Sequence, residues 1–461
     1  MSNGARPRAI PLAVLTALLC LTVSSRAQVP SPSPVATPQQ TPTITAPQVL
    51  GPPLSLDEAL RLANAQVSTF QNAGLNERIA AEDLRQAQAA FLPKISAPLG
   101  YTYTSPALSL PAGEPRRPSF VSADGIGVYD SLVNVSGDFD LAGRLRATVA
   151  KNRALLAAAR AGTEAARRAL ALGLIETYYG LALAKAQRRA AEGNLDSAEE
   201  FEHITSLLLS GGEVAAVDLT RAQLQTLTRR DELEKARANE EVAAGALRVL
   251  VGYEFGRPIT AADLELALPP ASDYQMFRVE DISRRPEFIQ FAQQVEAARQ
   301  EIRIARADRL PSLSYSINGG FNTDSVRAPR LKEHTGVSAG ISLSIPIFDW
   351  GATRSKQRQA KLRVELAKNE RTLALRGFTE QFYAARAQAA SAAARIGLAR
   401  EGVSKAQDSL AASIARYRAG EAQIVEVTDA QTTLVEQRTS LYQAIFDYRT
   451  ALARLRQATG G

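Results

Sequence analysis

Few residues of this chain are of the types that catalyse reactions or bind metals. Its two histidines, His203 and His334, belong to no metal-ligand motif; we expect the first on a helix surface and the second in a loop. The chain also has no glycine-rich phosphate loop and no nucleophile motif. The sequence therefore predicts no enzyme, no catalytic residue, no metal and no cofactor.

The single cysteine, Cys20, lies in a segment with the form of a secretory signal. Basic residues precede the apolar run AIPLAVLTALLCLTV, and SRA, ending at Ala27, fits a small-x-small cleavage site. The run is short for a transmembrane anchor, and Leu19 stands where a lipoprotein signal has a small residue. We predict a signal peptide over 1–27 and a mature chain without a thiol.

The charge of the chain gives no support to nucleic-acid binding. The formal charge is +7, and the first 27 residues hold three arginines and no acid, which leaves +4. Basic residues are spread among acidic ones rather than gathered in a patch. After the signal, no stretch of about 18 apolar residues predicts a membrane-spanning helix. Residues 28–54, rich in proline, serine, threonine and glutamine, are expected to form an arm without a core.

Four short stretches alternate apolar residues with small or polar ones. In GVSAGISLSIPIFDWG, residues 336–351, valine, isoleucine and leucine alternate with serine and glycine. The predicted strands cover about 94–104, 128–141, 312–322 and 336–348. Aromatic residues lie towards their ends: Tyr101, Tyr103, Tyr129, Phe139, Phe321, Phe348 and Trp350. One such strand fits a half-buried sheet in a soluble domain, but four behind a signal peptide favour an outer-membrane β-barrel.

Four strands are too few to close a barrel by themselves. Because open strand edges are not tolerated in lipid, several copies of the chain must share one barrel. Two copies would supply eight strands and three copies twelve. The strand pattern alone does not choose between these numbers.

Most of the remaining chain has long helical patterns. These cover four stretches, about 143–210, 214–250, 351–418 and 423–457. At a rise of about 1.5 Å per residue, the first reaches roughly 100 Å, which is too long for a compact domain. Alanine-rich seams with charge outside would let such helices pack into a tube. Each long helix returns through a glycine turn and so makes a hairpin.

The chain is a duplication. DFDLAGR matches IFDWGATR, and GGEVAAVDLTRAQ matches AGEAQIVEVTDAQ at an offset of 208 residues, which places Asp218 opposite Glu426. We divide the chain into a first repeat (55–252), an inter-repeat segment (253–281) and a second repeat (282–461). Each repeat contains helix, strand, strand, long helix and helix, and we expect the inter-repeat segment to form a belt. The predicted fold class is mainly α with a membrane β-barrel portion.

Over residues 55–461 the sequence resembles the TolC-like outer-membrane efflux proteins. The resemblance rests on the duplication, the LP helix-to-strand junctions, SIPIFDWG and YRAGEAQIVEVTDAQTTL. It implies a homotrimer in the outer membrane of a Gram-negative bacterium, with a 12-stranded barrel and a long periplasmic α-helical tunnel. The implied role is a passive exit channel of a tripartite efflux or type I secretion system. Its partners would be a periplasmic adaptor protein and an inner-membrane pump or ABC transporter; the sequence does not name the cargo.

The resemblance also implies a gate at the periplasmic end of the tunnel. In the family, acidic side chains form rings there, and Glu426 and Asp429 are at the matching positions. The two residues lie three apart on one helix face, so the three chains of a trimer would form two stacked rings of three carboxylates. Such rings attract cations, repel anions and raise one another's pKa. Tyr417 and Asp218 match a tyrosine–aspartate link between neighbouring helices, whereas Ala422 replaces a basic residue of some members. The alternative for the two acids is an ordinary solvated helix face.

Two hairpin tips are expected to dock the adaptor. They are Gly212, Glu213 and Val214 in the first repeat, and Gly420, Glu421 and Ala422 in the second. The alternative is a plain helix–helix turn, which glycine also suits. Two other functions remain open at this point: a periplasmic adaptor, and a self-assembling coiled-coil structural protein. Neither would need detergent to stay in solution, whereas the channel would.

Overall fold

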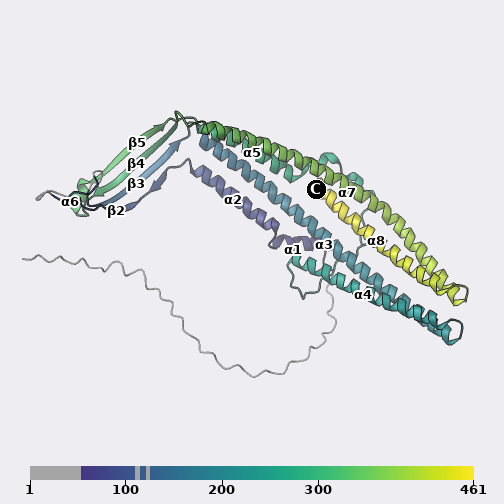
Figure 1. The fold of residues 1–461 in the computed structure, drawn as a ribbon. Helices are drawn as coiled ribbons and strands as arrows, with labels where there is room; N and C mark the ends of the chain where they lie inside the picture. The colour runs from purple at the N-terminus through teal and green to yellow at the C-terminus, as the bar shows by residue number, and fades with distance from the viewer. Residues whose placement is uncertain (1–52, 109–114, 121–124, 461) are drawn as a thin grey trace, which may run out of the picture. The chain divides into compact units, whose positions relative to one another are not determined.

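The computed structural model describes residues 53–108, 115–120 and 125–460. The expected signal peptide and nearly all of the proline-rich arm lie outside these residues. The first repeat contains α1 (Leu56–Ala65), α2 (Thr69–Ala89), β1 (Lys94–Ser96), β2 (Leu99–Tyr103), β3 (Gly127–Phe139), α3 (Arg144–Ser210) and α4 (Ala216–Val251). The remainder contains η1 (Asp273–Met276), η2 (Val279–Arg284), α5 (Pro286–Ala307), β4 (Ser312–Thr323), α6 (Ala328–Glu333), β5 (Thr335–Ser344), α7 (Ala352–Arg418) and α8 (Ile424–Ala458). The predicted combination of a strand sheet with long helices is confirmed (Figure 1).

The strands form one antiparallel sheet. Both β1 and β2 pair with β3, which pairs with β4, and β4 pairs with β5. The single strand expected over 94–104 is interrupted at Pro98, which has no amide hydrogen for the ladder, so β1 and β2 follow one another along β3 and occupy one place in the sheet. The strand expected over 336–348 ends at Ser344, shortly before Pro346, for the same reason. Within the described chain, β5 and the β1–β2 pair are the two edges of this sheet.

The two faces of the sheet differ as the alternation predicts. On one face the side-chain amide of Asn134 donates to the side-chain oxygen of Asn318, and serine stands opposite serine along β4 and β5. On the other face aromatic rings pair between strands. The ring centroids of Tyr101 and Tyr129 are 4.8 Å apart, and those of Phe139 and Tyr315 are 5.2 Å apart. One face is therefore polar and the other apolar.

The repeated phenylalanine–aspartate motif lies where a strand passes into a long helix. Asp140 accepts hydrogen bonds from the backbone N–H groups of Leu145 (2.9 Å) and Arg146 (3.0 Å), at the start of α3. Asp349 does the same at the start of α7, where Gly351 donates at 3.0 Å and Thr353 at 2.7 Å. These carboxylates satisfy N–H groups that have no partner within the helix, and their charge favours the helix N-terminus.

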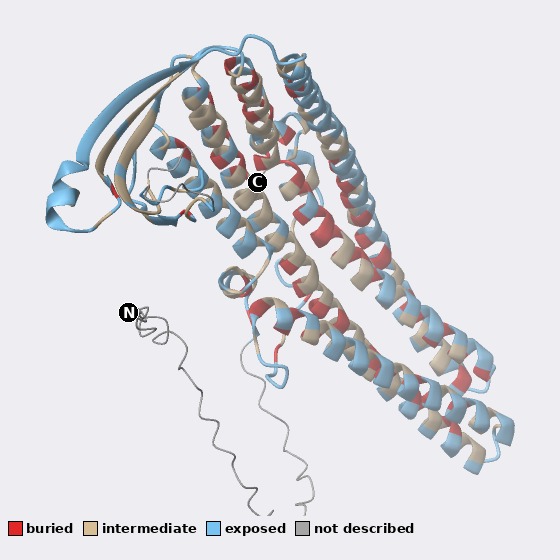
Figure 2. Cartoon of the chain, turned by 60° about the vertical axis from the view of Figure 1, so that its left-hand side comes forward, coloured by how far each residue is buried: buried red, intermediate tan, exposed pale blue. Residues whose placement is uncertain are grey.

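The helices pack side by side in a consistent order. Near the strands α3 contacts α2 on one side and α5 on the other, and α5 contacts α7. Towards the turns α3 contacts α4 and α8, and α8 contacts α7. Figure 2 shows buried positions running as narrow stripes along these helices. The stripes are rich in alanine, as at Ala154, Ala158 and Ala161 of α3 and Ala385, Ala389 and Ala392 of α7.

The first helix of the chain is interrupted. Ser55 accepts a hydrogen bond from the backbone N–H of Glu58 at 3.2 Å, which is one half of a capping box. The helical stretch before the first strand is divided at residues 66–68 into α1 and α2. The division lets α1 contact both α3 and α4, whereas α2 runs along α3 near the strands.

The inter-repeat segment is fixed to the middle of the helices by two buried side chains. The hydroxyl of Tyr178 donates to the carbonyl of Leu54 at 2.8 Å and accepts from the N–H of Ala262 at 3.0 Å. Arg449, 7% exposed, donates from Nε to the carbonyl of Leu264 at 3.0 Å. The segment therefore packs against α3 and α8, and a belt around a tunnel stays a prediction. Among the described residues, no helix has the length and apolar character to cross a membrane.

Candidate functional site

The two hairpins end in tips with the same backbone. In the second tip Gly420 has φ +74°, and the N–H of Glu421 donates to the carbonyl of Arg416 at 2.9 Å. In the first tip Gly212 has φ +75° and the corresponding hydrogen bond has the same length. Left-handed backbone of this kind favours glycine and ends a helix. The tips are thus well-formed helix–helix turns, and adaptor docking on them stays a prediction.

Four helices meet behind the tips in a small apolar cluster. Its buried members are Phe201 of α3, Ala222 of α4, Tyr417 of α7, and Ile424 and Val427 of α8. The rings of Phe201 and Tyr417 are 5.2 Å apart. Val214 and Ala422, from the two tips, pack against this cluster and are partly buried. In each tip the glycine and the glutamate are exposed. The cluster joins the first hairpin to the second within one chain.

Tyr417 is buried in this cluster, and among the residues that the structure describes its hydroxyl has no hydrogen-bond partner. Burial raises its pKa above the usual 10.0; the charge of Asp218 adds to this effect, and nearby Thr205 opposes it. Thr205 donates its own hydrogen bond to the carbonyl of Phe201 at 2.9 Å. The structure thus brings Asp218 near Tyr417 without a hydrogen bond between them, and their link as part of the gate stays a prediction.

Glu426 and Asp429 are both exposed on the first two turns of α8. Arg416, at the end of α7, places Nη1 2.9 Å from Oε2 of Glu426 and donates from Nη2 to the carbonyl of Glu421 at 3.3 Å. Within the described part of the chain, the carboxylate of Asp429 has no ion pair. The two predicted acids therefore differ: one is paired across the turn and the other is not.

Sequence reasoning missed Arg416. Alignment of the two tips at the offset of 208 residues could have identified it, because Arg416 then stands opposite the uncharged Leu208. At the position of Ala422 some members of the family have a basic residue. In this chain the positive charge at the tip comes from Arg416 instead. Between the two hairpins, Arg418 forms an ion pair with Glu200, at 3.6 Å between exposed side chains. Because exposed ion pairs contribute little to stability, the apolar cluster is the stronger tie between the hairpins.

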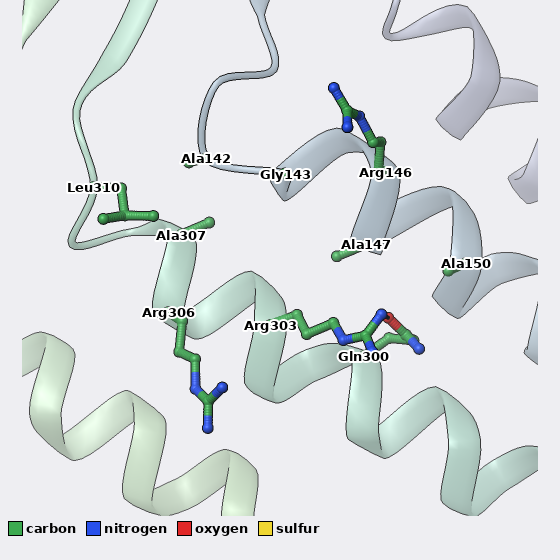
Figure 3. Close-up of a pocket in the computed structure, with 10 residues that line it drawn as sticks. All are labelled: Ala142, Gly143, Arg146, Ala147, Ala150, Gln300, Arg303, Arg306, Ala307 and Leu310. Carbon is green, nitrogen blue, oxygen red and sulfur yellow. Dashed lines mark hydrogen bonds between the residues drawn. The ribbon is translucent and has the colours of Figure 1, made fainter.

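A hollow at the junction of strands and helices has no converging set of polar groups. It lies between the start of α3 and the end of α5, and alanines form much of its wall. Figure 3 shows Arg303 beside Gln300, whereas Arg146 and Arg306 point away from one another. The described residues also contain no group of three or more histidine, cysteine, aspartate or glutamate side chains that could hold a metal. His203 is exposed on α3, and His334 is exposed at the end of α6.

Comparison with known sequences gives one family for both repeats. Residues 59–253 and 279–461 match the family described as outer membrane efflux protein. The alkaline protease secretion protein AprF of Pseudomonas aeruginosa is 29% identical over 348 residues, which cover 72% of this chain and 70% of AprF. The outer membrane protein TolC of Escherichia coli is 23% identical over 446 residues, 90% of this chain and 86% of TolC.

Solved structures show the same fold. The CmeC outer membrane channel of Campylobacter jejuni superposes with a TM-score of 0.78 at 18% identity, over 93% of this chain and 94% of that one. The outer membrane protein VceC of Vibrio cholerae gives 0.76 at 20% identity, over 88% and 96% of the two chains. These folds are those of channels rather than of enzymes. The chain belongs to the outer membrane efflux protein family and is an outer-membrane channel protein.

Proposed function

We propose that three copies of this chain close into one 12-stranded barrel and one continuous helical tunnel. The open edges of the sheet and of the helix layer are formed by elements that are consecutive in the chain, and this supports the proposal. The β1–β2 edge follows α2, and the β5 edge leads into α7. A copy placed at one edge therefore extends the sheet and the helix layer together.

Exposed leucines and isoleucines on the edge helices support this closure. On α7, Leu362, Leu366 and Leu373 are 58–64% exposed, and their spacing of four and seven residues puts them on one face. On α2, Leu75 and Ile79 are 54% and 60% exposed and lie four residues apart. Two apolar faces of this kind on opposite edges fit burial of α7 against α2 of the next copy.

The proposed role is passive export across the outer membrane. The polar face of the sheet lines the barrel and the apolar face meets lipid. The partners are a periplasmic adaptor protein, which docks on the hairpin tips, and an inner-membrane pump or ABC transporter that supplies the energy. AprF is named as a secretion protein, and the chain also resembles a protein named for pyoverdine export. The channel itself catalyses no reaction.

The gate is assigned to the end of the tunnel formed by the tips. Glu426 and Asp429 would form acidic rings about the threefold axis, and the nearby Tyr417 and Asp218 would join adjacent helices when the entrance is closed. Support comes from the nearness of Asp218 to Tyr417 and from the exposed positions of Glu426 and Asp429 on the first two turns of α8. Acidic rings at a narrow entrance favour cations.

Single-channel conductance of the detergent-purified protein in a planar bilayer tests this function. The experiment compares wild type with the double variant Glu426→Ala, Asp429→Ala. We expect small cation-preferring currents from wild type and a loss of preference or a larger conductance in the variant. Identical currents from both proteins would remove the gate from these residues. A protein that stays soluble without detergent and forms no channel would favour the adaptor or the coiled-coil structural protein.

A further inference from the structure

Arg416 stands in the second hairpin tip at a position where the first tip has the uncharged Leu208. Both tips have the same glycine geometry and the same 2.9 Å hydrogen bond to the carbonyl five residues earlier. That earlier residue is Leu208 in the first tip and Arg416 in the second. Since the first tip forms its turn without a guanidinium, the side chain of Arg416 is not required to make the turn. Its presence in the second tip therefore needs another explanation.

The guanidinium of Arg416 connects the end of α7 to the first turn of α8. It lies 2.9 Å from the carboxylate of Glu426 and donates to the carbonyl of Glu421 at 3.3 Å. The negative charge of Glu426 is thus balanced within its own chain. Asp429 lies three residues further along the same helix, and within the described chain no cation is paired with it.

We propose that Arg416 is a positioning residue that neutralises Glu426 and leaves Asp429 to set the ion preference of the tunnel entrance. This inference rests on the proposed function, which brings three copies of the tip around one axis. In that arrangement the Glu426 ring has one guanidinium for each carboxylate. The Asp429 ring has three carboxylates without a cation, so its field attracts cations.

The proposal gives opposite effects for the two members of the pair. Arg416→Gln uncovers the charge of Glu426, so a second acidic ring is added and the preference for cations rises severalfold. Glu426→Gln leaves the positive charge of Arg416 unbalanced at the tunnel entrance, so the preference falls. Asp429→Asn also lowers it. If the pair only stabilised the turn, Arg416→Gln and Glu426→Gln would loosen the entrance alike and shift the preference in one direction.

Reversal potentials in a planar bilayer under a potassium chloride gradient measure this preference. The full chain is compared with the three single variants and with the swap Arg416→Glu, Glu426→Arg, which restores the pair and should restore the wild-type preference. The control is Arg400→Gln, because Arg400 is exposed on the same helix and has no ion pair in the described structure. We expect it to leave the reversal potential unchanged.

Three results would overturn the inference. The first is a shift in the same direction for Arg416→Gln and Glu426→Gln. The second is an unchanged reversal potential for Asp429→Asn in a protein that still forms channels, which would leave the proposed function standing. The third is a wild-type protein that forms no channel at all, which would contradict the proposed function and this inference together. The number of chains in each particle, measured in detergent, verifies that every variant assembles.

Discussion

Asp140 gives a physical reason for the phenylalanine–aspartate motif that recurs in both repeats. Its side chain is 6% exposed, and both carboxylate oxygens accept backbone hydrogen bonds from the first turn of α3. A strand that runs directly into a helix of 67 residues leaves the N–H groups of that first turn without partners. The aspartate satisfies two of them and fixes where the helix begins.

Replacing this cap should loosen the start of α3. We expect Asp140→Ala to lower the local free energy of opening by about 1 kcal/mol, because two N–H groups lose their acceptor. Amide hydrogen exchange of residues 144–150 in detergent measures the change. Asp140→Asn keeps one acceptor oxygen and should show a smaller effect. Equal exchange rates in wild type and Asp140→Ala would show that Asp140 does not cap the helix.

At the scale of one helix, an ion-pair group in the strand-side half of α3 should make stability depend on pH. Hydrogen bonds from Arg167 and then Arg168 hold the pKa of Glu164 at about 2, below its usual 4.5. A lowered folded pKa gives stability that is present above the unfolded pKa, near 4.5, and is lost as the pH falls towards 2.

The variant Glu164→Gln removes this dependence. Wild type should be the more stable protein above about pH 4.5, and the difference should shrink to nothing as the pH approaches 2. Thermal unfolding midpoints of both proteins, measured by circular dichroism from pH 2 to 6, give the comparison. Midpoints that differ by the same amount over the whole range would show that ionisation of Glu164 contributes nothing.

At the scale of contacts between elements, Arg449 should determine how strongly the inter-repeat segment is bound to the helices. It donates to the carbonyls of Leu264 and Leu266 and to the hydroxyl of Tyr179. Arg449→Lys keeps the charge but cannot make these bonds together, because the ammonium lacks the planar fork of the guanidinium. We expect faster proteolysis within residues 253–281. Arg456→Lys, at an exposed position of the same helix, is the matched control and should leave the rate unchanged.

The sequence predicts the order of the elements because the alternation and the long helical patterns are strong. It predicts their limits less well where proline competes with the pattern, as at Pro98 and Pro346. The shape of the inter-repeat segment could not be predicted, since it depends on Arg449 and Tyr178 from distant helices. Arg416 escaped prediction for a similar reason: its partner Glu426 lies across a turn, and no local pattern marks the pair.

At the scale of the whole molecule, the edges of the sheet and of the helix layer coincide. We expect Leu366→Asp to weaken assembly, because the new charge would have to be buried between α7 and a neighbouring copy. Light scattering after gel filtration in detergent should show a smaller particle. Lys368→Asp, on the opposite face of the same helix, should assemble normally. Normal assembly of Leu366→Asp would exclude this face from the contact.

The number of chains in the detergent-purified particle shows whether this protein assembles as a trimer. Native mass spectrometry after release of the detergent counts them without reference to any gate or partner. Twelve strands require three copies, so we predict a mass of three chains. A mass of two chains would mean an eight-stranded barrel, and a single chain would leave both edges of the sheet open. Either result would contradict the proposed trimer.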